Sequence, residues 1–448
     1  MNVPALKPQE TPEAPGVHAR RLWSFRPKSD RQAGDAIVAN FILHWFPSKI
    51  YKPSLDWTYS FWLGTISAVL FAILCVTGVV LMFLYVPSVE RAYGTVKDIN
   101  YVVSFGPLVR GLHRVAAHGM VLVVFLHMVR VFLTGGYKAG KAADSRRPWN
   151  WVLGVVLLLV TLFFSFTGYL LPWDQLAFWA VTVGTNIARA APYVGDQISF
   201  ALLGGHNIDQ SALLRFYVLH VAVLPLVSAL LLGYHMWRVR KDGGLAAVDR
   251  ERLTAKRVTA DAASTKTWTL LGVAAGNTVH VTSLVPGDER DHVPSVPHLT
   301  RRILVVTLVT LLAVTALALV VASPLEAPAN PRITPNPAKA PWYFLWLQEL
   351  VSDTTFRIGS FIVNGALLGG MVIPGVLVLV LALWPWLDRS PVSTIGLWMP
   401  RGRRLQCTVF LVICLAIVAL TIVGLFLRGP YWQIYWPGQS WPETPLAM

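Results

Sequence analysis

The sequence predicts an all-α polytopic membrane protein, and three observations carry this prediction. Of the 448 residues, 54% are hydrophobic and only 14% are charged, and the mean hydropathy is +0.54. A soluble domain carries about 25% charged residues, so this chain lacks the polar surface that water requires. Seven apolar stretches are each long enough to cross about 30 Å of hydrocarbon, which takes about 20 helical residues. Together these observations exclude a soluble enzyme.

The predicted spans fall into a group of four and a group of three, divided by a long basic connection. We place the spans at 57–86, 107–134, 149–172, 211–239, 302–323, 359–386 and 405–427. A shorter segment, 34–47, is expected to lie on the membrane surface as an amphipathic helix. The first 56 residues are polar, basic and contain proline, so no cleavable signal peptide is expected. The predicted organisation is a cytoplasmic tail with the surface helix over 1–56, a four-helix bundle over 57–240, a cytoplasmic connection over 241–300, a three-helix domain over 301–430 and an external tail over 431–448.

Basic residues predict the orientation of the spans. With the N-terminus in the cytoplasm, the cytoplasmic segments hold 27 Lys and Arg residues and the opposite side holds 7. Because cytoplasmic loops are enriched in these residues, we expect the N-terminus inside and the C-terminus outside the cytoplasmic membrane of a prokaryote. The net charge of +15 then reflects topology, and binding to nucleic acid is not expected.

The cysteines exclude three kinds of site. Cys75, Cys407 and Cys414 all lie inside apolar runs, and no CxxC or CxxCH motif occurs. A disulfide framework, a cysteine zinc site and a covalently attached c-type haem are therefore not expected.

Four histidines lie inside predicted spans, where ionisable residues are costly and point to function. His113 and His127 are 14 residues apart on the second span. His220 and His235 are 15 apart on the fourth, and we expect a kink at Pro225 to absorb the extra residue. Each pair lies on one helix face, with its members about 21 Å apart along the helix. Both spans cross in the same direction, so two histidines face each other at each of two depths, as bis-imidazole ligation of haem iron requires.

Glycines repeat the histidine spacing on the other two spans of the group. Gly64 and Gly78 are 14 residues apart on the first span, as are Gly154 and Gly168 on the third. A porphyrin between helices needs facing backbone without a side chain, which glycine provides. Two simpler explanations are helix–helix contact for the glycines and buried, hydrogen-bonded side chains for the histidines. The matched spacing on all four spans favours two haems.

The remaining histidines are not predicted to be ligands. His118 lies about 140° around the helix from His113 and is expected to face away from the haem. The others fall in predicted loops or in the surface helix, namely His18, His44, His206, His280, His292 and His298.

Four motifs carry a resemblance to a known family. They are RGLHR at 110–114, HMVRVFLTGG at 127–136, TGYLLPWDQ at 167–175 and RFYVLH at 215–220. They resemble the cytochrome b subunit of quinol-oxidising cytochrome bc complexes, and the Pro-Trp-Asp-Gln stretch and the 15-residue spacing are most similar to the cytochrome b6 branch. The last three spans resemble subunit IV of the b6f complex, here fused to the same chain. The resemblance is close over 35–240 and looser over 300–430.

The resemblance implies a subunit of a quinol:cytochrome c-type oxidoreductase that holds two non-covalent b-type haems. Quinol would be oxidised at the outer face and quinone reduced near the inner face, coupled to proton translocation. A Rieske iron–sulfur protein and a c-type cytochrome would be partners, in a larger membrane complex that contains this chain as a homodimer. Arg110, Arg114 and Arg130 would pair with haem propionates, the alternative being that they extend to the membrane interface.

The resemblance also implies where quinol binds, with one departure from the family. The outer site would lie near Tyr169, against a loop in which the family carries Pro-Glu-Trp-Tyr. Here Trp342 and Tyr343 are kept, but Pro341 takes the place of the glutamate that is thought to accept a quinol proton. Glu349 lies about two helical turns beyond Trp342, and we expect it to be the substitute acceptor, with Asp353 next and a solvated loop acid as the alternative.

A second departure concerns the inner face. In the b6 branch a cysteine attaches an extra haem covalently, and here Trp62 stands at that position. No covalent extra haem is therefore expected. The inner quinone site would be framed by Asp35, Arg240 and Lys52.

Two other functions share part of this pattern. A dihaem cytochrome b membrane anchor of a dehydrogenase or hydrogenase would use the same histidines, but it would not need the Trp-Tyr loop or the last three spans. A transporter that relays protons through histidines would be colourless.

Overall fold

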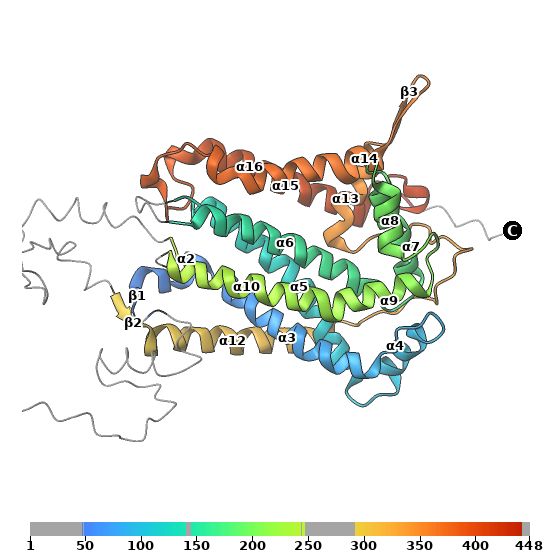
Figure 1. The fold of residues 1–448 in the computed structure, drawn as a ribbon, viewed down its shortest axis with the longest axis horizontal. Helices are drawn as coiled ribbons and strands as arrows, with labels where there is room; N and C mark the ends of the chain where they lie inside the picture. The colour runs from blue at the N-terminus through green and yellow to red at the C-terminus, as the bar shows by residue number, and fades with distance from the viewer. Residues whose placement is uncertain (1–46, 48, 140–144, 243, 247–291, 441–448) are drawn as a thin grey trace, which may run out of the picture.

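Seven membrane-length helices run side by side in the computed structural model, which describes residues 47, 49–139, 145–242, 244–246 and 292–440 (Figure 1). The predicted number of spans is confirmed among these residues. The spans are α3 (Leu63–Leu84), α5 (Gly106–Leu133), α6 (Arg147–Tyr169), α9 (Gln210–Val218) continuing through η3 (Leu219–Val223) into α10 (Leu224–Lys241), α12 (Ser295–Val320), α14 (Gly365–Leu367) continuing through η4 (Leu368–Val372) into α15 (Ile373–Leu387), and α16 (Arg404–Ile422) continuing into η7 (Val423–Leu427). The predicted surface helix at 34–47 lies, apart from residue 47, outside the described residues.

The first four spans form a bundle against which the last three pack on two sides. Helix α5 contacts α3 and α6, and α10 contacts α6. Helix α12 packs on α3 and α5, whereas α15 packs on α6. Figure 1 shows α12 at one edge of the molecule and α15 and α16 at the opposite edge. We call the two ends of the bundle the His113 end and the His127 end.

Two spans begin later than predicted because other structures precede them. Before α3, the short helix α2 (Trp57–Ser60) is separated by Phe61 and Trp62, both with positive φ. Before α14, the strands β3 (Phe356–Ile358) and β4 (Phe361–Val363) form an antiparallel hairpin that projects from the His113 end (Figure 1). Apolar sequence alone could not separate these segments from the spans that follow.

Among the described residues, four α-helices besides α2 lie outside the spans, all at the His113 end in Figure 1, and the sequence did not predict them. They are α4 (Ala92–Tyr101), α7 (Gln175–Arg189), α8 (Gly195–Leu203) and α13 (Trp342–Asp353). Asp174 begins α7, where its side chain accepts a hydrogen bond from the backbone N–H of Ala177 at 2.9 Å. Such a cap satisfies an amide that a helix leaves without a partner at its start.

The Pro-Trp-Asp-Gln motif joins the two halves of the chain at the His113 end. Gln175 accepts a hydrogen bond from the backbone N–H of Asn330 at 2.6 Å, and its own backbone N–H donates to Ala327 at 2.8 Å. Asp174 accepts another from the backbone N–H of Glu326. The motif therefore anchors the segment between α12 and α13.

A buried polar cluster joins the halves at the other end. Asp388, which directly follows α15, accepts a hydrogen bond from Tyr137 at 2.6 Å and lies 3.2 Å from Lys138 and 3.3 Å from Arg403. Arg403 also donates to the carbonyl of Phe132 at 2.8 Å. Strand β1 (Lys49–Tyr51) pairs with β2 (His292–Pro294) at this end as well.

Candidate functional site

Two histidines from different helices face each other at the His113 end of the bundle. The ring centroids of His113 on α5 and His220 in η3 are 6.3 Å apart. A metal ion between two imidazoles sits about 2 Å from each ligating nitrogen, which places the ring centroids about 6 Å apart. The separation therefore fits bis-histidine ligation of an iron.

Threonines fix both rings in the tautomer that ligation needs. The Thr77 hydroxyl donates to the carbonyl of Ile73 at 2.7 Å, so its oxygen is left to accept from Nδ1 of His113 at 2.9 Å. Thr167 likewise donates to a helix carbonyl and lies 3.1 Å from Nδ1 of His220. With the proton on Nδ1, each Nε2 is free to bind a metal.

Sequence reasoning missed both threonines, although a signal for them exists. Each directly precedes one of the spaced glycines, as Thr77-Gly78 and Thr167-Gly168. In each dipeptide the threonine bonds the histidine ring and the glycine leaves space beside that ring.

The spaced glycines lie directly against the histidine rings. A Cβ added to Gly168 would be 2.5 Å from Cε1 of His220, and one added to Gly78 would be 3.3 Å from Cε1 of His113. At the other level, the corresponding distances are 3.2 Å between Gly64 and His127 and 3.6 Å between Gly154 and His235. The structure therefore brings each predicted glycine together with one predicted ligand, and at Gly168, Gly64 and Gly78 a larger side chain would press on the ring.

The His127 end holds a buried cation beside its histidine pair. His127 and His235 are close enough to interact electrostatically. Arg130, one helical turn from His127, is 4% exposed, and its Nη2 has no hydrogen-bond partner among the described residues. Its guanidinium lies over the ring of Tyr59 at 4.6 Å. An unpartnered guanidinium nitrogen close to His127 fits an anionic group of a cofactor, such as a haem propionate.

The other two arginines are engaged by backbone carbonyls. Arg110 donates to Ser323 at 2.6 Å and to Pro324 at 2.8 Å, and Arg114 donates to Ala322 at 3.0 Å. These bonds hold the end of α12 against the start of α5. Arg110 therefore has a structural contact that the sequence did not predict, beside its expected pairing with a propionate.

The predicted outer quinol residues come together where α13 meets α5 and α6. Trp342 and Tyr343 begin α13, and Tyr169 at the end of α6 is close enough to Tyr343 to interact with it electrostatically. Burial raises the pKa of Tyr343 to about 12, so its hydroxyl keeps its proton at neutral pH. His118, which was expected to face away from the haem, accepts a hydrogen bond from Trp342.

Glu349 is held in an ion pair rather than beside Tyr343. Its side chain is fully buried, and both of its carboxylate oxygens accept hydrogen bonds from Arg428 at 2.9–3.1 Å. Arg428 also bonds Asp353 at 2.9 Å. The pairing ties α13 to the end of the last span, which favours a structural role over that of proton acceptor for both acids.

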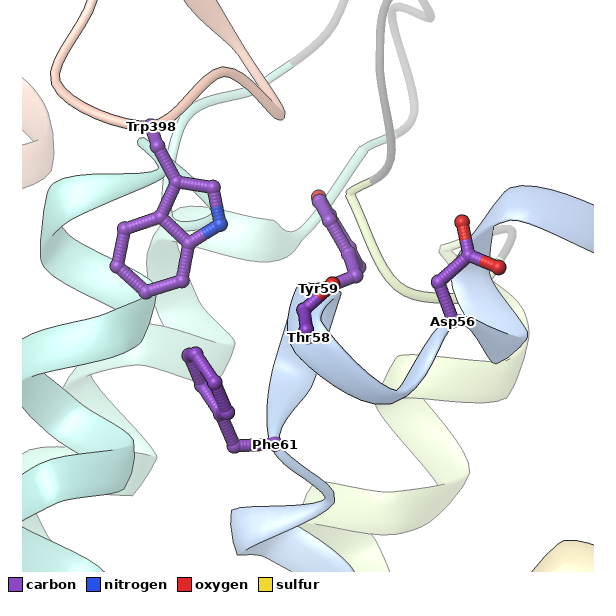
Figure 2. Close-up of a pocket in the computed structure, with 5 residues that line it drawn as sticks. All are labelled: Asp56, Thr58, Tyr59, Phe61 and Trp398. Carbon is purple, nitrogen blue, oxygen red and sulfur yellow. The ribbon is translucent and has the colours of Figure 1, made fainter.

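An open pocket of about 450 Å³, called the cavity below, lies at the His127 end of the molecule (Figure 2). Its lining residues are Asp56, Thr58, Tyr59, Phe61 and Trp398. Figure 2 shows the Trp398 ring beside Phe61, and their centroids are 5.9 Å apart in an edge-to-face arrangement. Apolar ring surfaces with one carboxylate suit a flat, partly polar ligand.

The three predicted inner residues are not all placed by the structure. Lys52 is exposed in η2 (Lys52–Leu55), just before Asp56, and Arg240 lies near the end of α10. Asp35 falls outside the described residues. Neither Lys52 nor Arg240 lines the cavity, whose lining the sequence did not predict.

Both halves of the chain match known proteins. Residues 48–243 match the family Cytochrome b/b6/petB, and residues 328–435 match Cytochrome b(C-terminal)/b6/petD. Cytochrome b6 of Prochlorococcus marinus is 42% identical over 196 residues, which make up 44% of this chain and 86% of that protein. Cytochrome b6 of Gracilaria tenuistipitata var. liui is also 42% identical, over 44% of this chain and 87% of that protein. A chain of a hyperthermophilic respiratory Complex III has a TM-score of 0.64 and 25% identity, over 84% of this chain and 86% of that chain.

Proposed function

Because this chain belongs to the cytochrome b/b6 family, we propose that it is the electron-carrying membrane subunit of a quinol:cytochrome c-type oxidoreductase. The observation that carries the proposal is the pair His113 and His220, 6.3 Å apart with both Nδ1 atoms held by threonines. Quinol is oxidised at the His113 end and quinone is reduced at the His127 end. The match of the last spans to the C-terminal family favours this function over a simple dihaem anchor.

Four histidines would hold two non-covalent b-type haems. His113 and His220 are the ligands at one level, and His127 and His235 at the other. When bound, the haems supply one-electron transfer between the two faces of the membrane. The glycines leave room for the rings of the ligands, and Arg130 offers its unpartnered nitrogen to a propionate.

The chain's own residues bind the substrates at opposite faces. We assign Tyr169, Trp342 and Tyr343 to the quinol site and the cavity beside Tyr59 to the quinone site. Lys52, Arg240 and Asp35 remain proposed as residues near the quinone site, where basic side chains favour an anion. Proton release at one face and uptake at the other couple the reaction to proton translocation.

The proposed orientation puts the His127 end in the cytoplasm. It follows from the 27 Lys and Arg residues in the segments that adjoin this end, against 7 in those of the other side. The membrane is then the cytoplasmic membrane of a prokaryote. A Rieske iron–sulfur protein and a c-type cytochrome accept electrons at the outer face, and the chain assembles as a homodimer within the larger complex.

A redox titration of the visible spectrum tests the proposal. The purified complex is expected to show two b-haem waves, and His127→Ala is expected to lose one of them. His298→Ala, which changes an exposed histidine at the start of α12, serves as the control and should keep both. A single wave in the unmodified complex would contradict the four-histidine assignment.

A further inference from the structure

His118 contacts both aromatic residues at the start of α13. Trp342 Nε1 donates a 3.0 Å hydrogen bond to Nδ1 of His118, and the ring centroids of His118 and Tyr343 are 5.8 Å apart. His118 lies on α5, five residues beyond His113, within a membrane-spanning helix. His118 therefore lies beside two of the side chains that we assign to the quinol site, Trp342 and Tyr343.

The hydrogen bond from Trp342 determines which nitrogen of His118 carries the proton. An indole N–H only donates, so Nδ1 of His118 must accept and cannot carry a hydrogen. The neutral ring then carries its hydrogen on Nε2. His118 is thereby a donor, with its N–H directed from the side of the ring opposite Trp342.

The Nε2 atom is open to its surroundings. Among the described residues no group forms a hydrogen bond with Nε2. The atom is also not fully buried, since it is absent from the buried polar atoms that lack a partner. A polar N–H at membrane depth needs a partner, because leaving it without one costs free energy. The atom is thus available to a ligand.

We propose that His118 is a substrate-binding residue, whose Nε2–H donates a hydrogen bond to a ring oxygen of the quinol. This inference rests on the proposed function. The two positions considered for a proton acceptor do not supply such a donor, since Pro341 has no polar side-chain atom and Glu349 is a carboxylate paired with Arg428. An N–H donor can bind both the hydroxyl oxygen of the quinol and the carbonyl oxygen of the product quinone.

Steady-state kinetics of the intact complex with a short-chain quinol test the contact. His118→Leu removes the donor and is expected to raise KM at least about tenfold, because the substrate oxygen loses its partner. His118→Gln keeps an amide donor and should recover most of the affinity. Trp342→Phe removes the hydrogen bond that fixes the tautomer of His118, and it should raise KM less than His118→Leu does.

Infrared difference spectra of a quinone labelled with ¹³C at its carbonyls give a readout that a structural role would not change. The hydrogen-bonded carbonyl band of the wild-type complex should move to higher frequency in His118→Leu and return in His118→Gln. His298→Gln should leave the band unchanged. Visible spectra with both b haems show which variants are assembled.

The outcomes separate this inference from the function on which it rests. If the wild-type complex holds both haems but oxidises no quinol, the proposed function is wrong. If it oxidises quinol, and His118→Leu changes neither KM nor the carbonyl band, the function stands and His118 does not bind the substrate.

Discussion

At the scale of single residues, two Thr-Gly dipeptides prepare one histidine pair for a metal. Thr77 holds the Nδ1 of His113 and Gly78 leaves room for its ring, and Thr167 and Gly168 do the same for His220. One position fixes the tautomer of the ligand and the next fixes its place. A substitution at either position should therefore act on cofactor binding more than on helix stability.

Gly168→Ala should weaken haem binding at the His113 end. The added methyl group would be 2.5 Å from Cε1 of His220, a distance at which the ring must move. We expect the purified protein to lose one of its two b haems, as measured by pyridine haemochrome content and redox titration. Gly233→Ala is the matched control, because a Cβ there has no atom within 4 Å, and it should keep both haems.

Glu349→Gln should destabilise the protein without changing the pH profile of quinol oxidation. Removing the charge of Glu349 leaves Arg428 with only the exposed carboxylate of Asp353, and loss of the buried partner costs about 3 kcal/mol of unfolding free energy. Thermal unfolding in detergent measures the loss. Asp353→Asn, at the exposed partner of the same arginine, should have a smaller effect. A pH profile that moves in Glu349→Gln would instead restore this residue as proton acceptor.

At the scale of elements, one wide helical turn reconciles the two histidine spacings. The turn η3 is a π-helix that follows α9, in which Leu224 donates to the carbonyl of Leu219, five residues before it. A π turn takes up one extra residue, so 15 residues cover the rotation of 14 in a regular helix. From the sequence we expected a kink at Pro225 to absorb the extra residue. Pro225 lies just after the π turn, in the first turn of α10.

Deleting one residue tests this explanation, and the position of the deletion decides the outcome. Removing Ala222 should convert the π turn into a regular helix and keep His235 on its face, so both haems should bind. Removing Leu231 leaves the π turn in place and rotates His235 by about 100°, so one haem should be lost. Haem content of the two deletions measures the difference, and equal losses would contradict the model of the turn.

At the scale of the whole molecule, polar contacts join the two halves at both ends. Asp174 and Gln175 hold the segment after α12 at the His113 end, and Asp388 gathers Tyr137, Lys138 and Arg403 at the other. Buried charges stabilise only when they are paired. These contacts fix the position of one half relative to the other, which keeps Trp342 and Tyr343 against the bundle.

Asp388→Asn should loosen the contact between the halves. Lys138 and Arg403 would remain buried without an anion, and we expect a loss of about 3–5 kcal/mol in unfolding free energy. Asp196→Asn, at an ion pair whose acid is 87% exposed, should cost less than about 0.5 kcal/mol. Thermal unfolding of both variants makes the comparison, and equal effects would contradict a stabilising role for the cluster.

The same cluster predicts a pH dependence. Burial alone would raise the pKa of Asp388, but hydrogen bonds from Tyr137 and Ser390 and the charge of Lys138 lower it from 3.8 to about 2. A carboxyl whose pKa is lowered by folding stabilises the protein above its unfolded pKa. Its contribution should persist down to about pH 4 and disappear as the pH falls toward 2. Asp388→Asn should lack this step in the dependence of stability on pH.

The sequence by itself determined the number of spans, the spacing of the histidines and the glycines that accompany them. These features depend on hydrophobicity and helical periodicity, which act over one or two turns and can be read along the chain. The aromatic residues Trp342 and Tyr343 were also named from the sequence, and their place in a quinol site stays a prediction.

Only the tertiary structure decided which distant residues meet. Trp342 and His118 are 224 positions apart, and Arg428 and Glu349 are 79 apart. No local pattern encodes such pairs, because they depend on how α13 packs against the first four spans and against the end of the last span. That packing turned His118 from an unassigned histidine into a proposed substrate-binding residue, and it placed Glu349 in an ion pair.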